Sequence, residues 1–261
     1  MNLIKKNFNS IIFFIIIFFS FLVNLYYSNI GSFPIDTFLH YDSSSRILDG
    51  EIPIRDFWIV SGFIIDFIQS LFFKLLGVNW NAYVFHSSLF NSLISLIIYY
   101  YFLNLEISKT ISLFLTCCFS ILAYTISGTP FVDHHAIFFL LISTILMIKV
   151  INIEKNNLWI LIILFFFLSF FTKQVPATYI ILTQGIIVSF YIFYEKKYII
   201  INYIALTCFF LILTFVSFLL YLNIDLKSFY IQYFDYPKSI GSSRLTNFEI
   251  TLNSFFNNYK F

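Results

Sequence analysis

The sequence predicts an all-α protein, a polytopic transmembrane helical bundle of about seven spans with an interfacial helix in its first extracytoplasmic loop. Hydrophobic residues make up 60% of the chain and charged residues only 11%, which is typical of a protein whose partner is the lipid bilayer. Long apolar runs favour helices, because a helix satisfies its own backbone hydrogen bonds within lipid. The formal charge of +2 is too small to predict nucleic-acid binding.

A spanning helix needs roughly 20 apolar residues, and several runs approach that length. The first run begins after Lys5 and Lys6. It is longer than the apolar core of a usual signal peptide and lacks a convincing cleavage site, so we expect a retained first span. The fifth run is short, and it reaches working length only if Thr172 and Lys173 lie at the interface. The expected spans are residues 10–27, 83–103, 111–127, 135–151, 158–171, 177–194 and 199–222.

The lysines concentrate in alternate short loops, which predicts the orientation of the chain. With the N-terminus in the cytoplasm, the basic loops face inward, as the positive-inside rule requires. The remaining loops then face outward, including the charged island of residues 33–57. We therefore expect a multi-pass protein of the plasma (inner) membrane with an extracytoplasmic active face. The lysines on the inner side are Lys5, Lys6, Lys109, Lys155, Lys196 and Lys197.

Residues 58–77 are long enough to span a membrane, but they include Asp66, Gln69 and Lys74. These polar residues occupy one side of a helix. Spanning would move every later basic loop outward, so we expect a helix in the outer interface, within a first extracytoplasmic loop of about residues 29–80. Residues 1–222 are then the transmembrane module. Residues 223–261 are expected to be an extracytoplasmic loop or an incomplete C-terminal region.

Three clusters of chemically active residues are expected on the outer side, at one depth. The first is the charged island, which contains Asp36 and His40. The second is Asp133 with the histidines that follow it, and the third is Lys173 with Gln174. Ionisable groups near a membrane core are costly and are retained mainly where they are paired or used. The clusters therefore predict a functional site at one membrane face.

Asp36 and the later segment Ile-Leu-Asp-Gly-Glu-Ile-Pro-Ile-Arg-Asp-Phe, residues 47–57, carry a resemblance to a known family. The order resembles the N-terminal part of bacterial C-type (GT-C) membrane glycosyltransferases, which are relatives of the protein mannosyltransferases and of the aminoarabinose transferases that modify lipid A. Thr172-Lys173-Gln174 resembles another box of the family. The resemblance covers about the first 180 residues, with Ile54 in place of the usual aromatic residue. Family members usually have more spans, so we expect a short or C-terminally truncated member.

The resemblance implies transfer of a sugar from a polyprenyl-phosphate carrier to an extracytoplasmic acceptor, which could be a glycan, a lipid or a protein. Asp36 matches the acidic residue of the family's first loop, which implies a general base for the acceptor hydroxyl. Asp133 lies where the family commonly has another functional acidic residue. Asp56 is a further catalytic candidate, although with Arg55 it could instead fix the loop.

Phosphate and substrate binding is expected from Arg55, Lys173, Gln174 and His40, because guanidinium and ammonium groups suit phosphate oxygens. Lys173 could alternatively be an interface lysine that reaches toward the headgroups. The same region could hold a divalent metal (Mg or Mn) that stabilises the phosphate leaving group. The alternative is a polar helix start, with Asp133 close to an N-cap. The metal set would be Asp36, Asp133 and His134.

Two other functions remain open from the sequence. One is a transporter or flippase component for a lipid or a small anion, and the other is an inactive truncated partner of a longer glycosyltransferase. A transporter should place ionisable or helix-breaking residues near the middle of its spans. Here these residues gather at one face, which favours an enzyme working at the interface.

Overall fold

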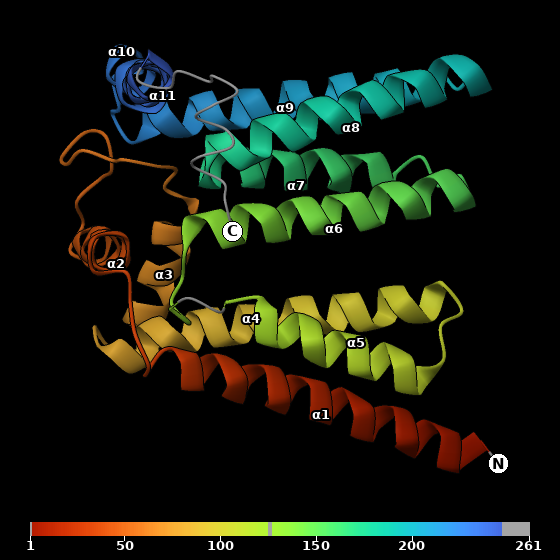
Figure 1. Cartoon of the computed structure of the whole chain (residues 1–261). Helices are drawn as coiled ribbons and strands as arrows, with labels where there is room; N and C mark the ends of the chain where they lie inside the picture. The colour runs from red at the N-terminus through yellow and green to blue at the C-terminus, as the bar shows by residue number, and fades with distance from the viewer. Residues whose placement is uncertain (1, 125–126, 247–261) are drawn as a thin grey trace, which may run out of the picture.

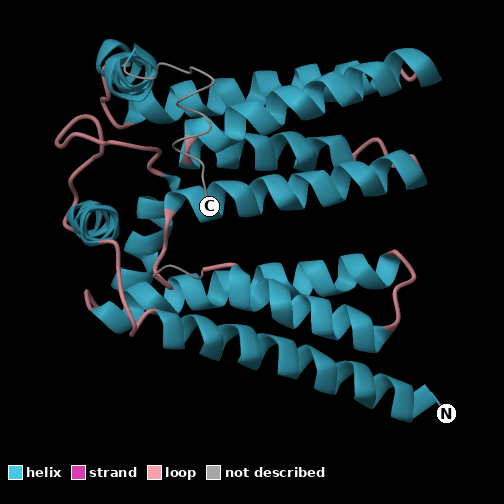
Figure 2. Ribbon diagram, in the orientation of Figure 1, coloured by secondary structure: helices cyan, strands magenta, loops and turns pink. Residues whose placement is uncertain are grey.

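The structure, a computed structural model, describes residues 2–124 and 127–246. The described part is almost entirely helices and their connections (Figure 2). Its β pairing is limited to one isolated bridge between Pro53 and Phe57. The all-α class predicted from the sequence is thus confirmed for these residues. Residues 125–126, near the end of the third expected span of residues 111–127, lie outside the described residues.

One set of helices runs side by side along one direction and forms the bundle, and the other described elements gather at one end of it (Figure 1). The bundle helices are α1 (Asn2–Tyr27), α4 (Trp80–Asn104), α5 (Lys109–Leu122), α6 (Val132–Ile153), α7 (Leu158–Thr172), α8 (Gln174–Glu195) and α9 (Ile199–Tyr221). The elements at the end are α2 (Pro34–Leu48), α3 (Ile64–Leu76), α10 (Leu226–Tyr230), the π-helical turn η1 (Ile231–Asp235) and α11 (Tyr236–Thr246).

Helices α4, α6, α8 and α9 are long and apolar enough to cross a membrane. Helices α5 and α7 and the segment Ile11–Tyr27 of α1 are apolar but shorter. Several helices are therefore compatible with a membrane protein. The full set of about seven spans stays a prediction, since three of the seven fall short of the length of the other four.

The bundle has two chemically different ends. One end, called the site end below, carries α2, α3, α10 and α11 (Figure 1). The other, called the basic end, carries the start of α1, the turn at 105–108 with Lys109 after it, and the turns at 154–157 and 195–198, which contain Lys155, Lys196 and Lys197. The charged island and the lysine-rich turns therefore lie at opposite ends, as expected. Which end faces the outside stays a prediction.

Helices α1, α4 and α5 pack through small polar side chains. The hydroxyls of Ser20 and Ser120 are 2.7 Å apart. Asn91 Nδ2 donates to the carbonyl oxygens of both serines at 3.1 Å, and Asn24 Nδ2 donates to Gly128 O at 2.9 Å. Such residues let backbones approach closely and satisfy one another within an apolar environment. This polar seam holds the N-terminal half of the bundle together.

Helices α6 to α9 form the C-terminal half, where the packing is mainly apolar. Trp159 and Ile162 of α7 are buried with Val188 of α8 and Ile200 of α9. Polar contacts add to this core: Ser169 Oγ donates to the α6 backbone, Ser143 Oγ donates to the α7 backbone, and Gln184 Nε2 donates to Thr144 Oγ1. Without a hydrophobic driving force in lipid, such close packing and hydrogen bonds must hold these helices together.

Helix α3 is shorter than the helix expected over residues 58–77. It begins only at Ile64, and residues 58–63 are not helical. An interfacial helix would turn its polar side toward water. Instead, Asp66 and Gln69 are buried, while Leu71 and Leu75 are exposed. The polar residues face inward because they find hydrogen-bond partners on α2 and α4. The interfacial placement of α3 is not confirmed.

The expected C-terminal loop is also corrected, because residues 226–246 are helical. Phe229 and Tyr233 stack on each other, with ring centroids 5.3 Å apart. Both rings lie against Phe171 at the end of α7. Burial of these aromatic rings offsets the weak apolar pattern of the segment. The rest of the expected loop, residues 247–261, lies outside the described residues.

Gly62→Ala is expected to destabilise the fold. Gly62 donates its N–H to Thr172 O at 3.1 Å, and a Cβ at this position would collide with the carbonyl group of Phe171. Overpacking against backbone costs about 1–3 kcal/mol, which thermal unfolding of the purified protein in detergent would register. Gly185→Ala is the matched control, because its Cβ would meet no atom within 4 Å. Equal unfolding midpoints for the two variants would contradict this close approach.

Candidate functional site

Helix α2 forms the first part of the charged island, which had been expected only as a loop. It begins with Pro34, whose fixed φ suits the first helical position. Thr37, His40 and Ser44 are buried on its inner side. Asp36 is exposed in the first turn and makes no side-chain hydrogen bond or ion pair within the described structure. It lies one helical turn from His40, so its carboxylate stands at the rim of the buried side.

His40 and Asp66 form a buried pair that joins α2 to α3. His40 Nδ1 lies 2.8 Å from Asp66 Oδ1, and the two side chains are only 5% and 4% exposed. Burial raises the pKa of the Asp66 carboxyl, while the charge and hydrogen bond of His40 oppose the rise. His40 Nε2 has no partner among the described residues. The pair therefore holds the imidazole in a fixed orientation between α2 and α3, with Nε2 free of a protein hydrogen bond.

A layer of buried polar rings lies beneath α3. His86 Nδ1 is 2.8 Å from Gln69 Oε1, and the ring of His86 lies 5.1 Å from that of His135. His135 Nε2 is 3.2 Å from the hydroxyl of Tyr124. The amide nitrogen of Gln69 and Nε2 of His86 are buried and have no protein partner. This layer, called the histidine layer below, connects α3, α4 and α6 with polar contacts at the site end.

Asp133 and Lys173, predicted to lie at one depth, are in direct contact. Lys173 Nζ donates to Asp133 Oδ2 at 2.7 Å. Their side chains are 31% and 34% exposed, so water reaches the pair. Asp133 lies in the first turn of α6, where its negative charge is favourable, but it is not the N-cap, which is Phe131. Gln174, expected to bind substrate, donates Nε2 to Tyr233 O at 3.0 Å.

The start of α2 packs against the segment that leads into α6. The rings of Phe33 and Phe131 are 5.9 Å apart, and the hydroxyls of Thr37 and Thr129 are 3.3 Å apart. These contacts bring the helix turn that carries Asp36 next to the helix start that carries Asp133. The three predicted clusters thus share the site end, although Asp36 does not contact the other two.

His134, the predicted third metal ligand, packs between aromatic rings. Its ring centroid lies 5.3 Å from that of Tyr124 and 5.4 Å from that of Phe131. Within residues 2–124 and 127–246, no group of three or more His, Cys, Asp or Glu side chains is placed to hold a metal ion. Asp133 already binds a cationic side chain. The donors as placed do not fit a divalent metal, and the Mg or Mn expectation remains untested.

Arg55 and Asp56 form a rigid turn. Arg55 Nε and Nη2 donate to the two carboxylate oxygens of Asp56 at 2.9 and 2.7 Å, and Ile52 N–H donates to Asp56 at 2.8 Å. These bonds lower the pKa of Asp56 to about 2. Arg55 also donates to Leu222 O at 3.0 Å. The geometry favours the loop-fixing alternative for this pair, because phosphate binding by Arg55 would require these bonds to break.

Gln232 completes this turn and was not anticipated from the sequence. It donates Nε2 to Ile54 O at 3.0 Å and accepts from Ile59 N–H at 3.2 Å. The tail is polar and aromatic, and its sequence contains no pattern that distinguishes Gln232. Asp66 was also missed as a site residue, although a carboxylate and Gln69 three residues apart in an apolar helix were a usable signal.

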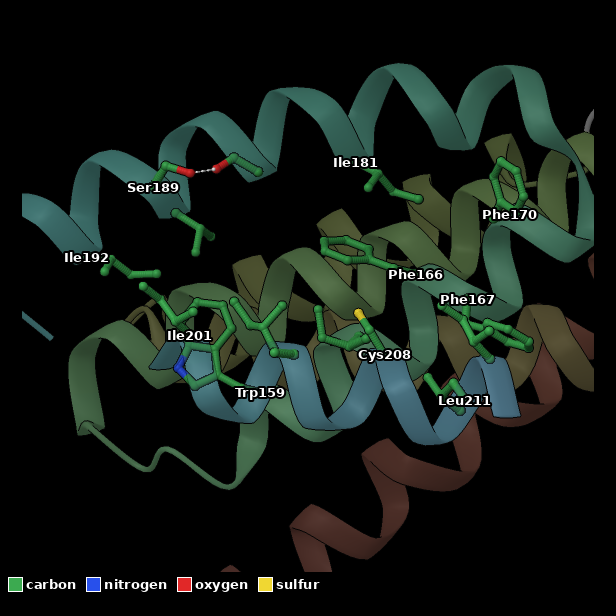
Figure 3. A pocket seen from close by; sticks show the side chains of 16 residues that line it. Trp159, Phe166, Phe167, Phe170, Ile181, Ser189, Ile192, Ile201, Cys208 and Leu211 are labelled. Atoms are coloured by element: carbon green, nitrogen blue, oxygen red, sulfur yellow. Dashed lines mark hydrogen bonds between the residues drawn. The ribbon is translucent and has the colours of Figure 1, made fainter. Parts of the chain in front are cut away.

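An apolar cavity of about 620 Å³ lies between α7, α8 and α9 (Figure 3). Figure 3 shows Trp159 near one end of it and Phe170 near the other, with Phe166 and Cys208 between them. The small residues Gly185 and Ala205 leave space between the helices. Because its lining is almost wholly apolar, the cavity suits a hydrocarbon chain.

Comparison of this chain with protein-family models, curated proteins and solved structures gave no match in any of the three.

Asp66→Ala is expected to destabilise the protein strongly. Removal of one partner leaves the other buried polar group unsatisfied, which costs about 1–3 kcal/mol, or more if that group is charged, and here it would leave the His40 ring buried beside a cavity. Replacing both residues with leucine should cost less, since neither polar group then stays unpaired. Chemical denaturation in mixed micelles measures the free energy of unfolding. Asp36→Ala, at an exposed position of α2, is the control, and equal stability of the two alanine variants would contradict the buried pair.

Proposed function

We propose that the protein is a membrane glycosyltransferase that moves a sugar from a polyprenyl-phosphate carrier to an acceptor outside the cell. One observation carries the proposal. The apolar cavity reaches Phe170, three residues before Lys173, whose ammonium group contacts Asp133. An apolar cavity followed by a cation and a carboxylate suits a lipid with a phosphate and a sugar at its head.

Lys173 is the proposed contact for the carrier phosphate. When the bond between the sugar and the phosphate breaks, negative charge develops on the phosphate, and a fixed cation stabilises that charge. Asp133 holds Lys173 in place through their 2.7 Å contact. The cation can turn to the phosphate without full desolvation, because both side chains are part-exposed. Gln174 has one amide hydrogen left after its bond to Tyr233 and is a second donor for the head group.

Asp36 is the proposed general base for the acceptor hydroxyl. Its carboxylate is exposed and unpaired within the described structure, so it is free to accept a proton from an incoming group. His40, one turn away and oriented by Asp66, is the proposed hydrogen-bond partner for a sugar or acceptor hydroxyl. Arg55 and Asp56 act by fixing the loop between α2 and α3. The motif resemblance to GT-C enzymes supports the same assignment of Asp36.

The expected activity is measurable with membranes containing the chain and a panel of polyprenyl-phosphate sugars, hexoses and pentoses, labelled in the sugar. Loss of a general base reduces rates by about 100-fold to 10,000-fold, so Asp36→Asn should show such a loss. Lys173→Gln should also reduce transfer, because it removes the phosphate contact. Asp42→Asn, at another exposed carboxylate of α2, should leave transfer unchanged. Wild-type transfer by the Asp36 variant, or no transfer by the wild type with any donor, would contradict the proposal.

The proposed orientation places the site end outside the plasma membrane and the basic end in the cytoplasm. In a chain with its native cysteines replaced by serine, Asp42→Cys should react in intact cells with a membrane-impermeant thiol reagent. Lys155→Cys, exposed at the basic end, should react only after the membrane is opened. Mass spectrometry of the labelled protein distinguishes the two results. The reverse pattern would overturn the orientation.

A further inference from the structure

A second cavity, of about 330 Å³, lies at the basic end between α4 and α6. Figure 1 shows the ends of these two helices apart from each other there, near the turns at 105–108 and 154–157. The cavity is thus formed where the two halves of the bundle diverge, far along the helices from the histidine layer. Its lining comes from the C-terminal parts of both helices and from the residue that follows α4: Tyr101, Asn104, Leu105, Ile145, Ile148, Lys149, Asn152 and Ile153.

Lys149 brings a positive charge to this cavity. Its side chain makes no hydrogen bond or ion pair within the described residues, whereas Lys173 and Lys197 each contact a carboxylate at 2.7 Å. The nearest carboxylates in sequence, Glu106 and Glu154, do not line the cavity, and Glu154 is the partner of Lys197. The lining therefore has a cation and no acidic side chain.

Polar donors and apolar surface accompany this cation. The carboxamides of Asn104 and Asn152 and the hydroxyl of Tyr101 make no protein hydrogen bond in the described part of the chain, so each has a donor for an oxygen-rich anion. Ile145 and Ile148 line the same cavity with hydrocarbon. A cation, amide donors and an adjoining apolar wall are complementary to a phosphate that carries apolar chains.

The surroundings favour an anionic ligand from the membrane. Lys155, Lys196 and Lys197 follow in the turns of the same end, and lysines near a membrane surface attract anionic lipids. Basic pockets between spanning helices on that side suit phospholipid head groups. A free metabolite would gain nothing from the isoleucine wall.

We propose that this cavity binds the phosphate head group of an anionic membrane phospholipid, with Lys149 contacting the phosphate and the acyl chains lying along Ile145 and Ile148. Asn104, Asn152 and Tyr101 donate to the remaining phosphate and glycerol oxygens. The site lies at the opposite end from Asp36 and Lys173 and takes part in no step of sugar transfer. The proposal therefore stands or fails independently of the proposed enzymatic activity.

Binding of short-chain phosphatidylglycerol to the delipidated full chain in detergent, measured by native mass spectrometry, tests the site. A lost charge-assisted contact should weaken binding about tenfold in Lys149→Gln, and Lys149→Arg should retain most of the affinity. Lys155→Gln is the matched control, because Lys155 is exposed at the same end but does not line the cavity. Unfolding midpoints of the variants should equal that of the wild type, since both lysines are exposed.

Two further ligands test the chemistry. Phosphatidylcholine has the same phosphate with a compensating cation, and it should bind more weakly than phosphatidylglycerol. Inorganic phosphate lacks the apolar chains and should not displace the lipid at equal concentration; equal displacement would overturn the membrane lipid as the occupant. Wild-type affinity in Lys149→Gln, or the same loss in Lys155→Gln, would overturn the site itself, because general attraction to the basic end would then explain the binding.

Discussion

The placement of the site depends on one buried contact, between His40 of α2 and Asp66 of α3. A carboxylate and an imidazole are costly to bury alone, but each satisfies the other across 2.8 Å. One turn further along α3, Gln69 makes the equivalent contact with His86 of α4. The two contacts set the rotation of α3 about its axis, so that its polar side faces inward. The contact with His40 also fixes α2 at the site end of the bundle. Asp36 stands at the edge of the site because α2 is fixed in this way.

The second constraint is the turn that contains Arg55 and Asp56. Its charged residues face each other and the backbone, so the most distinctive sequence motif of the chain has a structural explanation. Gln232 connects the same turn to η1. Among the predicted site residues, Asp36 is exposed and the pair of Lys173 with Asp133 is part-exposed, so water reaches all three. A charged residue in a recognisable motif is therefore weaker evidence for catalysis than an accessible one beside it.

Sequence patterns predicted the helical class and the bundle helices, because long apolar runs favour helices. They also predicted that Asp133 and Lys173 lie at the same depth, because the positions of the loops between apolar runs determine depth along the bundle. They did not predict α2 or residues 226–246 as helices, since both are polar or mixed and are stabilised by distant contacts such as Phe229 with Phe171. The sequence also did not predict that Asp66 faces inward, because its partner is on another helix. Helical periodicity groups polar residues on one side, but only the partner His40, from another helix, decides whether that side faces water.

The bond from Gln232 to the carbonyl of Ile54 also constrains how the chain is made. Its two residues are 178 positions apart, and Gly62 meets the end of α7 more than a hundred residues later in the chain. During synthesis the first loop leaves the ribosome long before either partner exists. Its final shape must therefore form late, after α7 and η1 have been made, by closure of a very long loop.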